Sequence, residues 1–125
     1  MNRSSGILLP VSALPGPCGI GDLGADARDF IDFLAAAGQR YWQILPLNPP
    51  DGAHSPYLSA STFAGSTDLL SPEPFVARGA LTADEVRAID WGEDPMRVDY
   101  DRALGHGVRA RKGIRRARAA RRARG

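Results

Sequence analysis

The chain has little cysteine and no long apolar run. Its 125 residues contain one cysteine, Cys18, so no internal disulfide forms and no cysteine cluster holds a metal. No basic residue lies close to Cys18 in sequence, which argues against a nucleophilic role. No stretch approaches the roughly 18 apolar residues that cross a membrane, and the start shows no signal segment. These absences predict a cytoplasmic protein without a membrane partner, metal or cofactor.

The charged residues divide the chain into two unlike parts. Residues 1–104 carry seven arginines and all fourteen acidic residues, a net charge of −7. Residues 105–125 carry eight arginines, one lysine and no acidic residue, a net charge of +9. Such a tail suits a nucleic-acid arm, because nine positive charges release counterions from phosphate, whereas its lack of aromatic residues argues against a membrane-surface helix. The interpretation that we favour is a frameshifted or truncated reading frame, because wrong-frame translation of a GC-rich gene yields mainly arginine and alanine.

Residues 6–45 have the pattern of a strand, a loop, a helix and a second strand. Gly6–Leu9 is a short apolar run, and Tyr41–Leu45 is rich in aromatic and β-branched residues. Between them, apolar residues recur at helical spacing from about Ala25 to Ala37. A unit of this length predicts two parallel strands with a right-handed crossover.

Each predicted strand runs into a long loop. Pro10–Gly24 is dense in proline and glycine, and Asn48–Gly65 is a polar loop that opens after Pro46 ends the second strand. Because loops that follow parallel strands emerge at the same edge of a sheet, we expect the two loops to lie side by side. A shared ligand cleft is predicted at this edge.

Short helices are predicted after the second loop. Ser71–Pro74 opens a helical segment that Gly79 ends. Thr82 and Glu85 have the spacing of a capping box, which marks the start of another helix. Residues 71–104 are therefore expected to form a small helical segment.

Several of these segments together resemble the N-terminus of a bacterial 4-α-glucanotransferase. They are SSGILLPVSALPGPCGIGDLG, GQRYWQILPLNPP, SPY and FAG, which follow the family's order and spacing over roughly residues 3–100. The family, also called amylomaltase or disproportionating enzyme, belongs to the α-amylase-like clan and has a (β/α)8 catalytic barrel. The resemblance implies an α/β fold in which residues 1–70 form the first β-α-β unit of a TIM barrel and its substrate loop, residues 71–104 a helical insertion, and residues 105–125 a separate Arg-rich tail.

The same resemblance implies transfer of α-1,4-glucan segments from a donor to an acceptor sugar by a retaining double displacement. One carboxylate attacks the anomeric carbon, while a second acid protonates the leaving oxygen and later deprotonates the acceptor. In the family both lie on later barrel strands, so we expect an N-terminal fragment that lacks catalytic residues and is inactive alone. The alternative function is a small nucleic-acid-binding protein that uses the basic tail.

Tyr57 in the Ser-Pro-Tyr motif is the residue that the resemblance assigns to the substrate. In the family this tyrosine lies at the cleft and contacts bound sugar, with an apolar ring face and a hydroxyl. Ser55 is the second candidate, although its hydroxyl is also suited to stabilising a turn. His54 stands where many members have an acidic residue, and it is expected to be an exposed loop histidine without a catalytic role.

Three acidic residues lie in or beside the two loops, and none is predicted to be catalytic. Asp22 is expected to shape the loop or cap the helix that follows it. Asp51 belongs to a Pro-Asp-Gly turn, and Asp68 is expected at a turn or strand edge. None has a paired acid on a rigid element nearby, which a retaining glycosidase needs.

Overall fold

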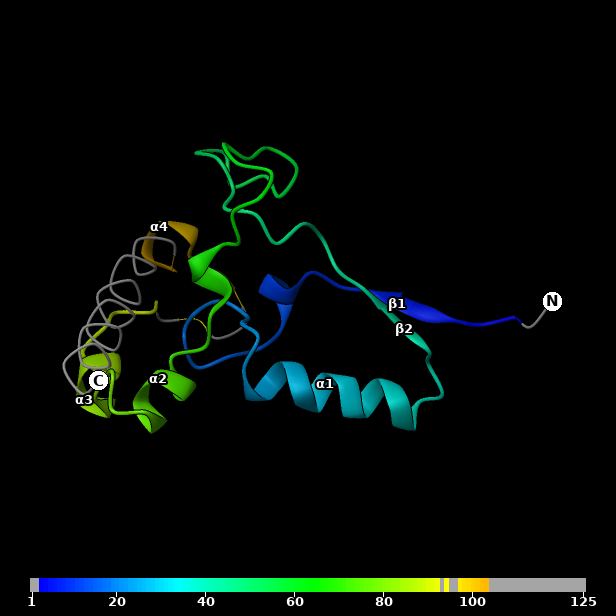
Figure 1. The fold of residues 1–125 in the computed structure, drawn as a ribbon, viewed down its shortest axis with the longest axis horizontal. Coiled ribbons are helices and arrows are strands. Elements are labelled where there is room, and N and C mark those ends of the chain that lie inside the picture. The colour runs from blue at the N-terminus through cyan, green and yellow to red at the C-terminus, as the bar shows by residue number, and fades with distance from the viewer. Residues whose placement is uncertain (1–2, 93, 95–96, 104–125) are drawn as a thin grey trace, which may run out of the picture.

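The computed structural model describes residues 3–92, 94 and 97–103, and the Arg-rich tail at 105–125 lies outside these residues. Within them, a two-stranded parallel sheet and one long helix are followed by an extended loop and three short helices (Figure 1). The elements are β1 (Gly6–Leu8), α1 (Ala25–Ala36), β2 (Tyr41–Gln43), α2 (Glu73–Ala77), α3 (Ala83–Arg87) and α4 (Tyr100–Ala103). Two 3-10 turns lie in the connections, η1 (Val11–Ala13) and η2 (Thr67–Leu69).

The two strands pair in parallel over three residues, with Gly6 opposite Tyr41. Only glycine fits there, because a Cβ atom at Gly6 would lie 2.5 Å from the carbonyl oxygen of Tyr41. The pairing extends to Leu9, whose N–H donates to the carbonyl oxygen of Gln43 at 3.0 Å. The parallel order is confirmed, but both strands are shorter than predicted. β1 gives way to η1 at Val11, so β2 has no ladder partner beyond Gln43.

α1 runs beside the two strands (Figure 1) and contacts β2 through Phe30. Leu34 is buried, and Phe30 meets the ring of Trp42 edge-on, with ring centroids 5.1 Å apart. The helix ends one residue earlier than predicted, and Gly38 follows with a φ of +70°, a conformation that costs glycine little. Phe33 remains 63% exposed, so the apolar stripe of α1 is wider than the surface that covers it.

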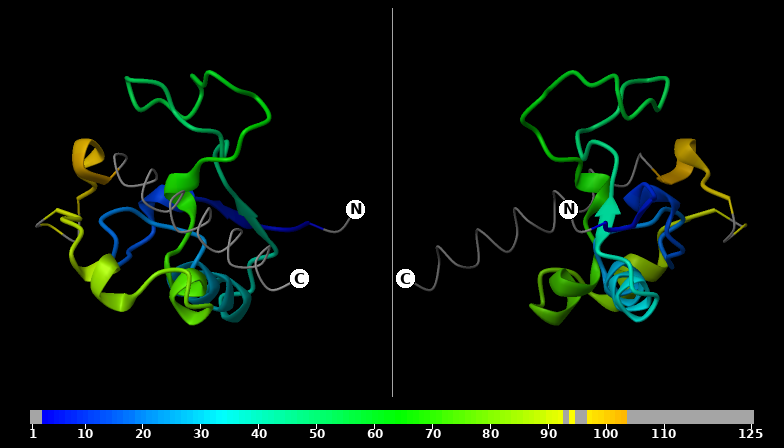
Figure 2. Two further views of the ribbon diagram at one scale, coloured as in Figure 1. Left: turned by 60° about the vertical axis from the view of Figure 1, so that its left-hand side comes forward. Right: turned by 90° about the vertical axis from the view of Figure 1, so that its right-hand side faces the viewer.

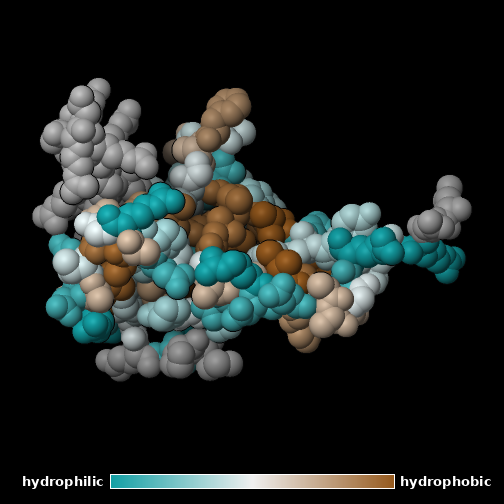
Figure 3. Space-filling model, turned by 60° about the horizontal axis from the view of Figure 1, so that its bottom comes forward, coloured by the Kyte–Doolittle hydropathy of each residue, from teal (hydrophilic) through white to brown (hydrophobic). Residues whose placement is uncertain are grey.

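Four of the seven buried apolar residues in the described part of the chain lie in the loop between β1 and α1, and none lies in the strands. The four are Val11, Leu14, Cys18 and Ile20, all between 2% and 6% exposed. In contrast, Leu8 and Tyr41 of the sheet are 57% and 65% exposed, which leaves apolar surface open to solvent. Figure 3 shows apolar side chains gathered in the middle of one face of the molecule. The fold is mixed α/β with a small parallel sheet, as predicted at this level.

α2 ends, and α3 begins, where the sequence indicates, whereas α4 was not predicted. α2 is followed by Gly79 with a φ of +67°. α3 begins with the predicted capping box, in which the Thr82 hydroxyl accepts from the Glu85 N–H at 3.1 Å and the Glu85 carboxylate accepts from the Thr82 N–H at 2.9 Å. Among the described residues, no helix combines the length and apolar character needed to span a membrane.

Candidate functional site

The loops that follow β1 and β2 lie side by side, as predicted. They enclose a hollow of about 200 Å³ beyond the carboxyl ends of the strands. The first loop contributes Val11, Ser12 and Ile20 to its wall, and the second contributes Leu47, Asn48 and Pro56. Parallel α/β sheets place their ligand sites at this edge, because loops from several strands converge there.

Asn48 organises the second loop, and the sequence analysis did not single it out. Its side-chain amide donates to the carbonyl oxygens of Ser61, Thr62 and Ala64 at 2.9, 2.6 and 3.3 Å. The N–H of Ser66 closes the loop by donating to the carbonyl oxygen of Leu47 at 2.7 Å. One amide therefore holds together a segment that contains no helix or strand. The sequence did carry one signal of this role: Asn48 is a residue with a side-chain donor that lies between prolines at the start of a long polar loop.

The loop at 48–65, which contains Tyr57, extends away from the two strands and α1 (Figures 1 and 2). The Tyr57 side chain is 72% exposed, and it is not among the residues that line the hollow. The Ser55 hydroxyl accepts from the Tyr57 N–H at 3.4 Å, the local turn contact that its type predicted. The structure thus brings Ser55 and Tyr57 together and leaves the Tyr57 ring free to contact a ligand.

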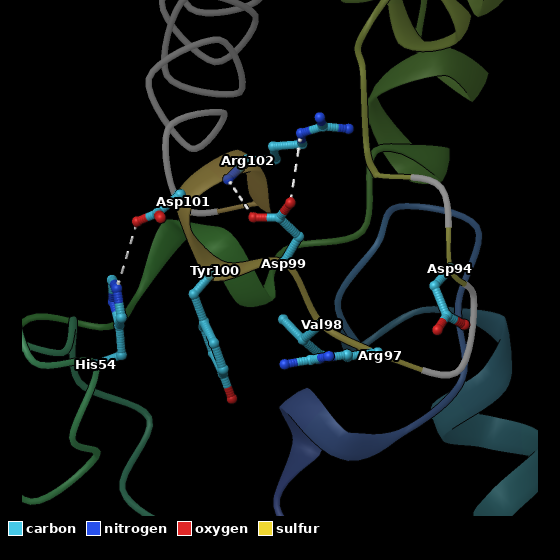
Figure 4. Close-up of a pocket in the computed structure, with 8 residues that line it drawn as sticks. All are labelled: His54, Asp94, Arg97, Val98, Asp99, Tyr100, Asp101 and Arg102. Carbon is cyan, nitrogen blue, oxygen red and sulfur yellow. Dashed lines mark hydrogen bonds and ion pairs between the residues drawn. The ribbon is translucent and has the colours of Figure 1, made fainter.

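His54 differs from its expected place. The sequence predicts an exposed histidine, but the His54 side chain is only 33% exposed and contacts α4 (Figure 4). The imidazole stacks on the ring of Tyr100 with centroids 5.2 Å apart, and its Nε2 lies 3.8 Å from Oδ1 of Asp101. The expectation failed because Tyr100, 46 residues further along the chain, folds back onto the loop.

The acidic residues near the loops have the structural roles that were predicted. Asp51 closes its turn by accepting from the Ala53 N–H at 3.1 Å, and Asp68 accepts from the Ser66 hydroxyl at 3.2 Å. Asp22 is buried beside the start of α1 and accepts hydrogen bonds from the Gly24 N–H and the Ser71 hydroxyl. Burial raises the pKa of the Asp22 carboxyl above its usual range, against the opposing effect of these hydrogen bonds.

Cys18 is buried close to Asp22. Burial, followed by the negative charges of Asp22 and Asp26, raises the pKa of its thiol to about 11. A thiol of this kind is a weak nucleophile at neutral pH, in agreement with the sequence analysis. In the part of the chain that the structure describes, no three His, Cys, Asp or Glu side chains gather as a metal site.

A model of the 4-alpha-glucanotransferase family, glycoside hydrolase family 77, matches residues 9–121. The chain belongs to this family. A 4-alpha-glucanotransferase of Thermus thermophilus is 49% identical over 98 residues, which are 78% of this chain and 19% of the relative. A 4-alpha-glucanotransferase of Streptococcus pneumoniae serotype 4 is 47% identical over 98 residues, with the same shares of the two chains.

A solved glucanotransferase structure supports the same assignment. The amylomaltase of Streptococcus agalactiae, in complex with acarbose, is 36% identical and superimposes with a TM-score of 0.85. That match covers 92% of this chain and 23% of the amylomaltase. The chain therefore spans about a fifth of the length of the relatives that it matches, so it corresponds to one part of the family's fold.

Proposed function

We propose that this chain provides the first β-α-β unit and the substrate loop of a (β/α)8 4-α-glucanotransferase. The whole enzyme transfers α-1,4-glucan segments between sugars by a retaining double displacement in the cytoplasm. Residues 1–70 begin the barrel and residues 71–104 form a helical insertion. The observation that carries the proposal is the family match over residues 9–121. This match also runs into the Arg-rich tail, which begins at residue 105.

The position of the two loops supports a role in sugar binding. Active sites of (β/α)8 barrels are built from the loops after the strands, and here these loops already enclose a hollow. Tyr57 has an exposed ring with a hydroxyl at its end. Such a ring packs on the apolar face of a sugar, and its hydroxyl forms hydrogen bonds with the sugar hydroxyls. Ser55 fixes the backbone of Tyr57 through its turn contact. We therefore assign α-1,4-glucan binding to Tyr57, supported by Ser55.

The acids of this segment do not supply the chemistry. A retaining mechanism needs two carboxyl groups about 5–5.5 Å apart, one of them free to attack the sugar. Asp51 and Asp68 hold turns, and Asp22 is buried under hydrogen bonds from Gly24 and Ser71. The chain alone therefore binds glucan at most and leaves the glycosidic bond intact. The nucleophile and the acid/base belong to the part of the barrel that this chain does not cover.

A chimera tests the proposal. The 98-residue matching segment of the Thermus thermophilus relative is replaced by the corresponding segment of this chain, and glucose release from maltotriose is measured. The chimera is expected to be active, whereas this chain alone releases no glucose. In the chimera, Tyr57→Ala is expected to raise KM about tenfold through the lost ring contact, while Tyr57→Phe keeps most of the affinity. A folded chimera without activity, or an unchanged KM for Tyr57→Ala, would contradict the assignment.

A further inference from the structure

We propose that His54 is a positioning residue that fastens the substrate loop to α4 by stacking on Tyr100. The inference deepens the proposed function and rests on it only where sugar is concerned, because the loop is the one that carries Tyr57. His54 lies three residues before Tyr57. When His54 is fixed, Tyr57 therefore stays within about 10 Å of it along the backbone.

The two rings meet as an aromatic stack between distant parts of the chain. Their centroids are 5.2 Å apart and their planes are inclined by 13° (Figure 4). His54 comes from the loop and Tyr100 from the first residue of α4. A short turn holds the histidine in place, because its N–H donates to the carbonyl oxygen of Asp51 at 2.9 Å. The stack therefore joins the loop to a second element of the structure.

Two features of His54, its backbone conformation and its Nδ1 atom, are unfavourable in free energy. Its φ is +58°, the left-handed region, which residues other than glycine enter rarely, although histidine and asparagine do so more often than most. Its Nδ1 is buried and has no hydrogen-bond partner among the described residues. Hydrogen bonding at Nδ1 therefore does not hold the ring. The contact that compensates for both costs is the stack on Tyr100.

The stack contributes more than the neighbouring contact with Asp101, which is an ion pair only when the imidazole is protonated. The Asp101 side chain is 97% exposed and its Oδ1 lies 3.8 Å from the histidine Nε2, so water screens this pair strongly. α4 is held mainly by Ala103, which is only 2% exposed, because the ion pairs of Arg102 with Asp99 at 3.3 Å and Asp90 at 3.4 Å are partly exposed and contribute little. The stack thus attaches the loop to a helix, α4, that is itself packed through Ala103.

Hydrogen exchange of the full 125-residue chain tests the stack without any sugar. The reporters are the amides of Asp51 and Leu58, which donate within the loop at 2.8 and 3.2 Å, and the amides of α1 are the internal reference. His54→Asn tolerates the left-handed backbone but lacks the ring, so both reporters are expected to exchange about two- to tenfold faster. Tyr100→Leu is expected to do the same, whereas Tyr100→Phe and Asp101→Asn change the rates less than about twofold.

Coupling separates a stack from a general loss of stability. The double variant His54→Asn with Tyr100→Leu is expected to exchange no faster than either single variant, while the α1 amides stay unchanged in all of them. Unchanged loop rates in His54→Asn, equal acceleration in Tyr100→Phe and Tyr100→Leu, or loop amides without protection in the unaltered chain would each overturn the inference.

The sugar-dependent part is tested in the chimera. There His54→Asn is expected to raise KM for maltotriose about two- to tenfold with kcat unchanged, the signature of a binding loop that must be reordered. A lowered kcat at constant KM would overturn the positioning role. Because the exchange measurement contains no sugar, an inactive chimera would count against the proposed function and leave the stack standing.

Discussion

The two loops that follow the parallel strands are built in opposite ways. The loop at 10–24 is a packed part of the core, with Val11 only 2% and Ile20 only 6% exposed. The loop at 48–65 is held open by polar contacts, and it leaves Tyr57 72% and Phe63 100% exposed. The two loops at this sheet edge thus differ in role: the first forms a packed wall, and the second presents side chains to solvent.

The difference lies in what closes each loop. In the first, backbone passes so close to backbone that a Cβ atom at Gly21 would lie 2.1 Å from the carbonyl oxygen of Val11. In the second, the amide of Asn48 reaches across the loop to three carbonyl oxygens, and a Cβ atom at Gly52 would meet nothing within 4 Å. The first loop therefore tolerates almost no added volume, while the second depends on a few donors.

Matched glycine substitutions should separate the two loops most sharply. Gly21→Ala forces its methyl group into backbone and is expected to cost about 3 kcal/mol or more of the free energy of unfolding. Gly52→Ala is the control in the open loop, with an expected change within about 1 kcal/mol. Urea unfolding of both variants measures the contrast, and equal midpoints would show that the first loop is not packed as described.

Removal of the Asn48 amide should destabilise the loop at 48–65 without affecting the loop at 10–24. Asn48→Ala removes the donor that three carbonyl oxygens share and is expected to cost about 0.5–1.5 kcal/mol locally, because water replaces the donor at the two exposed contacts. Asn48→Asp should be worse, because a carboxylate offers only acceptors to those oxygens. Limited proteolysis at 48–65, with cleavage in 10–24 as the reference, reports the effect. Equal acceleration in both loops would argue against a local role for Asn48.

Asp22 should give the smallest effect, visible as a pH dependence. Its pKa is raised in the folded chain, mainly by burial, from the ordinary value of 3.8. Its protonated form is favoured in the fold, so its contribution to stability is fully present below pH 3.8 and is lost as pH rises through the raised folded value. Asp22→Asn is expected to lose less stability than the unaltered chain over that window. Parallel unfolding midpoints of the two proteins against pH would contradict this.

Local rules predicted the elements well. The capping box at Thr82 and the glycine at 79 marked a helix start and a helix end correctly, because these signals act within a few residues. The parallel order of the strands also followed from their spacing. The structural roles of Asp51 and Asp68 were visible for the same reason, since each accepts from a donor within two residues of it.

Contacts between distant residues were not visible in the sequence. The stack of His54 on Tyr100 depends on how the 45 residues between them fold, so the histidine was predicted to be exposed to solvent. The hydrogen bonds of the Asn48 side chain could not be predicted for the same reason, because its partners are main-chain carbonyls 13, 14 and 16 residues away. Main-chain acceptors carry no residue signature, so no motif could have named them.

The pairing of Gly6 with Tyr41 also has a consequence for the order of folding. The two residues are 35 positions apart, and closing a chain segment of that length costs about 3 kcal/mol of entropy. A ladder of three residue pairs recovers little of this cost, so the strands come together only once α1 has shortened the segment between them. Ile7 and Leu8 of β1 must therefore stay without their partners, Trp42 and Gln43, until the helix has formed.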